Sequence, residues 1–126
     1  MVQSRDLQPI DLAEKLAGID EYYHPGTVAE FNGQDVMVAK LKGEFVWHHH
    51  PDTEDVFLVL RGKLGIRLRD RGEETTVILT AGQMLVVPRG MEHQPFADQE
   101  VEVLLMERSG TPNTGDRATA TPRRQL

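Results

Sequence analysis

The chain has no cysteine among its 126 residues. Disulfides, thiolate metal ligands and a cysteine nucleophile are therefore excluded. The N-terminus carries early charges and no apolar run, so we do not expect a signal peptide. No stretch approaches the roughly 20 apolar residues that span a bilayer, and no membrane partner is expected. Together these absences predict a cytoplasmic protein.

Positive charge is also scarce. Lysine and arginine number 14 against 20 aspartate and glutamate residues, which gives a net charge of −6 and a pI near 5.3. Phosphate backbones bind surfaces of the opposite sign, so nucleic acid is not an expected partner. The remaining classes are proteins that bind or transform small molecules and proteins that bind other proteins.

Helical patterning is confined to one short stretch. Leu12, Leu16 and Ile19 recur at helical spacing, and Asp11 can cap the N-terminus of the helix. We therefore expect residues 1–26 to form a helical segment that packs on the outside of a larger unit. A chain of this length supports one compact core.

Residues 27–108 alternate between short β-forming runs and turn residues. Asn32-Gly33 and Arg71-Gly72 are hairpin signals, and eight or nine short strands are expected. The run 56–60 (VFLVL) is apolar on both faces, so a second sheet or a partner subunit should cover it. This pattern predicts an all-β, antiparallel sandwich or barrel, followed by a tail at 109–126 that is loose or lies over its surface.

Four potential metal ligands fall in two segments of this β region. His48 and His50 are two residues apart, and residues two apart on a strand point to the same side. Asp55 follows across a short turn, and His93 ends the second segment. Three imidazoles and one carboxylate suit iron, manganese, nickel or zinc. If the fold brings them together, they form a mononuclear metal site.

The same two segments resemble the paired motifs of the cupin superfamily. The first motif matches Gly43, His48-x-His50, Asp55 and Gly62, with a spacer one residue shorter than usual. The second matches Gly82, Pro88, Gly90 and His93, with Ala97 in place of the usual asparagine. The resemblance extends over about residues 40–116. Over this range the chain resembles small single-domain bacterial cupins of unassigned function.

The resemblance implies a jelly-roll β-barrel with one divalent transition metal ion in its mouth, and a homodimer. It implies His48, His50 and His93 as ligands, and Asp55 in a position where the family normally has glutamate. The shorter aspartate could bind the metal directly or through a water, or could only orient a histidine. Glu54 has the longer side chain but faces the opposite way.

The function implied is that of a mononuclear metal-dependent enzyme acting on a small molecule, of oxygenase, decarboxylase or isomerase type. The alternative is a non-catalytic module that binds or senses a small ligand, because fold alone does not fix function. Phe57 is expected to line the pocket floor. Met84, Val86, Pro95 and Phe96 are expected to line the cavity or to fill the core.

Overall fold

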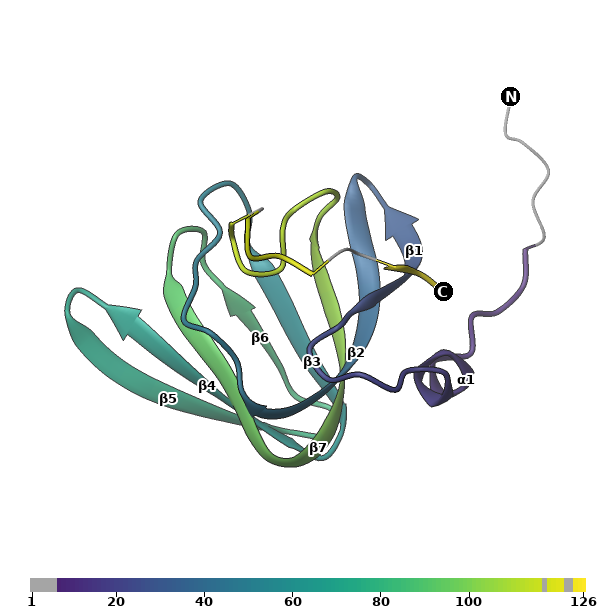
Figure 1. Cartoon of the computed structure of the whole chain (residues 1–126), viewed down its shortest axis with the longest axis horizontal. Helices are drawn as coiled ribbons and strands as arrows, with labels where there is room; N and C mark the ends of the chain where they lie inside the picture. Colours follow the sequence, from purple (N-terminus) through teal and green to yellow (C-terminus); the bar gives the residue numbers. More distant parts are fainter. Residues whose placement is uncertain (1–6, 117, 122–123) are drawn as a thin grey trace.

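The computed structural model describes residues 7–116, 118–121 and 124–126, so residues 1–6 of the expected N-terminal segment and residues 117 and 122–123 of the tail lie outside this description. Within the described residues, the chain forms one short helix and eight strands (Figure 1). These are α1 (Leu12–Ala17), β1 (Gly26–Phe31), β2 (Gln34–Glu44), β3 (Asp55–Arg61), β4 (Lys63–Asp70), β5 (Glu73–Thr80), β6 (Met84–Val87), β7 (Glu92–Arg108) and β8 (Arg124–Gln125).

The strands form one curled sheet around a central core (Figure 1). The order is β5-β4-β7-β2-β1-β8, and β3 pairs with β7 on one side and β6 on the other. All pairs are antiparallel except the short contact between β1 and β8. The predicted antiparallel all-β fold is therefore confirmed, as are the two hairpins, which join β1 to β2 and β4 to β5.

The expected number of strands was wrong, because two strands are much longer than the turn signals indicated. Seven strands, rather than eight or nine, cover residues 26–108. β7 runs for 17 residues and pairs first with β4 and then with β3, so one strand serves both sides of the barrel. Gly43 does not end a strand either. It lies within β2 at positive φ, where the pairing register with β7 shifts.

Alternating side chains fill the barrel interior. β3 shows the pattern clearly, since Asp55, Phe57 and Val59 are buried and the residues between them are only half buried. The main core consists of apolar residues from six strands: Ala39, Leu41, Phe57, Val59, Leu64, Ile66, Leu79, Val87, Ala97, Val101 and Val103. Burying these side chains supplies the main driving force for folding. Met84 and Val86, which we expected inside, are 55% and 44% exposed on the outer face.

The short helix α1 covers part of the outer surface (Figure 1). Asp11 caps it by accepting a hydrogen bond from the Glu14 backbone N–H at 3.2 Å. Leu16 and Ile19 then pack on Val38, and Leu60 of β3 joins this cluster. The second apolar face of β3 is thus covered at Leu60 by the chain's own helix.

The C-terminal segment returns across one end of the barrel (yellow in Figure 1). The Ser109 hydroxyl donates a hydrogen bond to the Asp35 carboxylate at 2.8 Å, and Gly115 packs against the backbone of His49. At the end of the chain, the backbone N–H of Leu126 donates to the carbonyl of Thr27 at 2.9 Å. The described part of the tail is therefore laid over the surface of the barrel.

Candidate metal centre

Two of the four candidate ligands are joined through their backbones. His48 donates its N–H to the carbonyl of His93 at 3.0 Å, and His93 donates its own N–H to the carbonyl of His48 at 2.9 Å. This reciprocal pair connects the segment before β3 to the start of β7. Gly90 adds a further link by donating its N–H to the carbonyl of His50 at 2.9 Å. These backbone hydrogen bonds therefore join the two sequence motifs at the residues that carry the histidine side chains.

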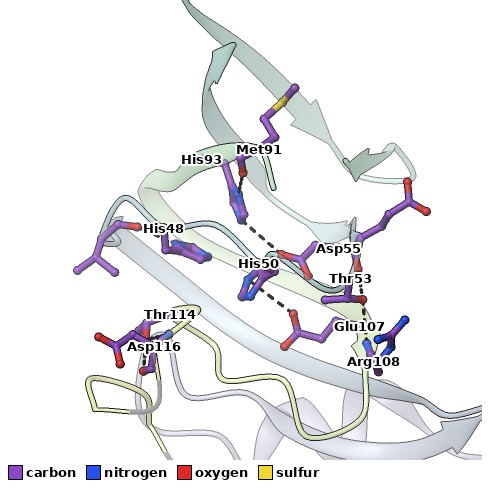
Figure 2. A network of polar contacts seen from close by, with 12 residues as sticks. His48, His50, Thr53, Asp55, Met91, His93, Glu107, Arg108, Thr114 and Asp116 are labelled. Carbon is purple, nitrogen blue, oxygen red and sulfur yellow. Dashed lines mark hydrogen bonds and ion pairs between the residues drawn. The ribbon is translucent and has the colours of Figure 1, made fainter. Parts of the chain in front are cut away.

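The imidazole rings of His48 and His93 are oriented by a matching pair of hydrogen bonds. Nδ1 of His48 lies 2.9 Å from the carbonyl of Val46, and Nδ1 of His93 lies 2.9 Å from the carbonyl of Met91 (Figure 2). A carbonyl can only accept, so Nδ1 carries the proton in both rings and Nε2 carries a lone pair. Each lone pair is thereby available to a metal ion.

The four side chains converge inside the barrel (Figure 2). One ligand atom from each of His48, His50, Asp55 and His93 lies within 4.8 Å of the others, and all four residues are buried. Oδ2 of Asp55 is 2.9 Å from Nε2 of His50 and 3.4 Å from Nε2 of His93. The structure therefore brings together every residue that the sequence nominated as a ligand.

The electrostatics of the centre favour a neutral His48 and a charged Asp55. Burial lowers the pKa of His48 to about 4, and repulsion from His93 contributes in the same direction. Burial alone would raise the pKa of Asp55. The hydrogen bond from His50 and the contacts with His93 and Glu107 outweigh it, and the pKa falls below its usual value. These are the protonation states in which both residue types bind metals.

A small apolar cavity adjoins three of the four candidate ligands, His48, His50 and Asp55. The centre of a water molecule can move through about 50 Å³ of this cavity. This volume holds a few waters or a compact ligand group. Its lining includes His48, His50 and Asp55, and otherwise consists mainly of apolar and aromatic side chains: Tyr23, Pro25, Met37, Leu41, Phe45, Phe57, Pro95 and Leu105. Phe57 and Pro95 therefore lie where we expected, at the cavity. Phe96 instead covers Gly65 and stacks beneath Arg67.

The neighbours of the ligands in the sequence point away from the centre. Glu54 is exposed while Asp55 is 6% exposed, so Asp55 is the acid that lies in the histidine cluster. His49 is exposed, as the alternation of side chains along 48–50 requires. His24 lies outside the cluster, 3.2 Å from Glu21.

Sequence reasoning missed one acid at the centre. Glu107 is 7% exposed, lines the cavity, and has its Oε2 atom 3.8 Å from Nε2 of His50 (Figure 2). The signal was available: Val101, Val103 and Leu105 alternate along β7 as inward residues, and Glu107 continues the series. An acid at an inward position of an otherwise apolar alternation is an informative departure from the pattern.

A segment of the tail completes the cavity wall. Asn113 lines the cavity, and its side-chain oxygen accepts a hydrogen bond from the Thr121 N–H at 3.0 Å. The neighbouring Gly115 sits so close to His49 that a Cβ atom there would collide with the His49 carbonyl. The tail therefore contacts the backbone between two candidate ligands and contributes to the cavity wall.

Comparison with known proteins agrees with this fold. Residues 35–107 match the cupin domain family, and the chain belongs to that family. A 68-residue segment, 54% of the chain, is 38% identical to the uncharacterized protein YdbB of Bacillus subtilis (strain 168) and covers 58% of it. A 61-residue segment, 48% of the chain, is 30% identical to bovine (Bos taurus) 3-hydroxyanthranilate 3,4-dioxygenase and covers 21% of that enzyme. The chain thus spans less than two thirds of the length of each of these two relatives.

Solved structures show the same architecture. A cupin-2 domain protein from Shewanella frigidimarina NCIMB 400 has a TM-score of 0.73 and 37% identity, over 79% of this chain and 93% of that one. Hydroquinone 1,2-dioxygenase from Sphingomonas sp. TTNP3, in complex with 4-nitrophenol, has a TM-score of 0.74 and 18% identity, over 87% and 36%. Structural relatives thus include a dioxygenase with a small aromatic ligand. In the described part of this chain, no helix is long and apolar enough to cross a membrane.

The depressed pKa of His48 predicts a pH dependence of stability for the metal-free protein. In the unfolded chain this imidazole takes up a proton near pH 6.5, whereas in the folded protein it does so only near pH 4. Between these values the unfolded state binds more protons, so the free energy of unfolding should fall as the pH falls, by up to about 1.4 kcal/mol per pH unit.

Urea unfolding at several pH values between 7 and 4, with a chelator present, measures this slope. His48→Gln removes the titrating group and should flatten the dependence over that window. Parallel slopes for the parent and the variant would contradict the assignment.

The close contact at Gly115 predicts a large cost for a single added methyl group. Gly115→Ala should destabilise the protein through its positive φ of 76°, by about 1–2 kcal/mol. The collision with the His49 backbone should add about 1–3 kcal/mol more. Urea unfolding and limited proteolysis of the tail measure both effects.

Gly110→Ala is a matched control. Gly110 lies in the same segment with a φ of 83°, but a Cβ atom there meets nothing within 4 Å. This variant should show only the backbone cost and keep the protease resistance of the parent. Equal losses in the two variants would show that the contact with His49 is unimportant.

Proposed function

We propose that the protein is a mononuclear metal-dependent enzyme of the oxygenase type, acting on a small aromatic molecule. One divalent ion, iron by preference, would be held by His48, His50, His93 and Asp55. The observation that carries this proposal is the convergence of four buried donor side chains, three of which line an apolar cavity. An ion bound there would supply Lewis acidity and, if it is iron, a site for dioxygen.

The chemistry of the donors supports a cation at this position. Nε2 of His93 is buried without a hydrogen-bond partner and lies 3.4 Å from Oδ2 of Asp55. Both atoms are acceptors once Nδ1 of His93 is committed to the Met91 carbonyl. Two buried acceptors that face each other without a shared hydrogen are costly, and a metal ion between them removes the cost.

The residues around the centre suit a small, flat, apolar substrate. Tyr23 and Phe45 stack with their ring centroids 4.7 Å apart and form one wall of the cavity, and Phe57 lies at another. These side chains would exclude water and hold an aromatic ring by dispersion and stacking. The two dioxygenases among the relatives are named for aromatic compounds, which supports the same substrate class.

Oxygen uptake tests the proposed activity. Protein purified without a histidine tag and loaded with ferrous iron should retain near-stoichiometric iron. It should consume about one dioxygen per substrate molecule cleaved, because a dioxygenase incorporates both oxygen atoms and needs no further reductant. 3-Hydroxyanthranilate and hydroquinone are suitable first probes. His50→Ala should lower iron retention and oxygen uptake by about 100-fold, since it removes a ligand.

His49→Ala provides the control, because it removes an exposed imidazole from the same run and should leave both quantities unchanged. Iron binding without oxygen uptake or substrate conversion would instead favour a non-catalytic module that binds a small ligand. Equal trace metal in the parent and His50→Ala would end the metal proposal altogether.

We also propose that the protein is a homodimer formed through the outer face of β3, β6 and β7. Six neighbouring outward side chains there are apolar and partly or largely exposed: Val56, Leu58, Met84, Val86, Leu104 and Met106. A contiguous exposed apolar surface of this kind is typical of an interface. A second copy would complete the cover over β3 that the VFLVL run requires.

Val86→Lys should therefore shift the protein from dimer to monomer, because it places a charge in the interface. Light scattering coupled to gel filtration measures the mass. Ile78→Lys on β5 is the control, since Ile78 is similarly exposed (49% against 44%) but belongs to a different face. A monomeric parent, or a dimer that tolerates Val86→Lys, would refute this interface.

A further inference from the structure

Among the described residues that line the cavity, one neutral polar side chain still has hydrogen-bond donors to spare. The Tyr23 hydroxyl is committed, because it donates to the carbonyl of Gly43 at 2.6 Å. The Glu107 carboxyl group is hydrogen-bonded to Asp55. Apart from these residues and the candidate ligands, the described lining is apolar except for Asn113 of the tail. Asn113 is therefore the side chain that can add a polar contact to a ligand in this cavity.

The backbone of Thr121 fixes the orientation of the Asn113 amide. The Thr121 N–H donates to the Asn113 side chain at 3.0 Å. An N–H can only donate, so the atom that it meets is the carbonyl oxygen Oδ1, and the NH2 group takes the other position. Nδ2 has no hydrogen-bond partner within the part of the chain that the structure describes. A half-buried side chain at the cavity wall thus keeps two N–H donors for a ligand.

The loop of the tail that carries Asn113 is closed by its own hydrogen bonds. Within its described residues, the N–H of Gly115 donates to the carbonyl of Pro112 at 2.9 Å, and the hydroxyls of Thr114 and Thr119 lie 2.8 Å apart. The close contact of Gly115 then seats the loop on the barrel. A loop organised in this way presents Asn113 in one position before a ligand arrives, which lowers the entropic cost of binding.

We infer that Asn113 is a specificity-determining residue, whose NH2 group donates a hydrogen bond to an oxygen substituent on the ring of the substrate. The inference rests on the proposed function, because it adds a recognition element to the same cavity. A single donor on an otherwise apolar wall fixes the orientation of a flat ligand. A ring that carries a hydroxyl, carbonyl or carboxylate oxygen is thereby preferred over a ring of the same shape that cannot accept this hydrogen bond.

A matched pair of neutral ligands tests this preference. Acetophenone and α-methylstyrene have nearly the same shape, but only the ketone carries an oxygen acceptor. Their dissociation constants are measured by equilibrium dialysis against the full chain with a chelator present, so that no metal ion competes for the ketone oxygen. The ratio of the two constants is then compared between proteins, which cancels the difference in hydration between the two ligands.

Two substitutions separate the donor from other roles of this side chain. Asn113→Asp keeps the acceptor for the Thr121 N–H and removes the NH2 group, whereas Asn113→Ala removes both without adding a charge. If Asn113 is the donor, both variants should weaken binding of the ketone relative to the hydrocarbon by about fivefold. Asn32→Asp is the matched control, since it makes the same chemical change at an exposed turn residue outside the cavity and should leave the ratio unchanged.

The outcomes separate this inference from the proposed function. A ratio that shifts in Asn113→Ala alone would reflect displacement of the loop, and one that shifts in Asn113→Asp alone would reflect the added charge, so either result contradicts the donor role. A parent that binds both rings, with the same ratio in both variants, overturns the role of Asn113 and leaves the proposed function standing. A parent that binds neither ring overturns the aromatic substrate class, and this inference with it.

Discussion

The centre depends on the reciprocal backbone hydrogen bonds between His48 and His93. These two residues are 45 positions apart in the sequence, yet each donates its N–H to the carbonyl of the other. With the backbones locked together, each Nδ1 atom finds a carbonyl two residues earlier in the chain, and each Nε2 atom is turned inward. The geometry of the candidate ligands is thus set by the main chain, before any metal contributes energy.

The surrounding barrel makes this arrangement electrostatically demanding. Asp55 and Glu107 are carried into an apolar interior by strands whose other inward residues are valine, leucine and phenylalanine. A buried charge such as that of Asp55 needs partners, and burial lowers the pKa of the neighbouring His48 to about 4, so this imidazole is neutral at pH 7. The divalent cation that we propose would satisfy the Asp55 carboxylate and the imidazole lone pairs together.

Much of this arrangement could be read from the sequence. Alternation along strands predicted that His48 and His50 share a side and that Asp55, rather than Glu54, faces the core. The cupin motifs then supplied His93 and the type of fold. The long course of β7 was not predictable, because its 17 residues contain no change of pattern that marks where it passes from β4 to β3.

Other features depended on tertiary contacts. Glu107 continued a visible alternation, but only the pairing of β3 with β7 puts it beside Asp55. Met84 and Val86 read as core residues by composition, and the structure places them outside, because β6 lies at the edge of the sheet and only its other face is covered. The position of the tail over the cavity likewise follows from contacts such as that of Gly115 with His49.

The most direct test of this account is X-ray absorption at the metal edge of the protein loaded with one equivalent of ferrous iron. The account predicts a single iron environment in which the extended fine structure requires three imidazole rings, with the remaining ligands oxygen. A spectrum fitted by oxygen ligands alone, without the scattering of imidazole rings, would contradict the claim that His48, His50 and His93 hold a metal ion together.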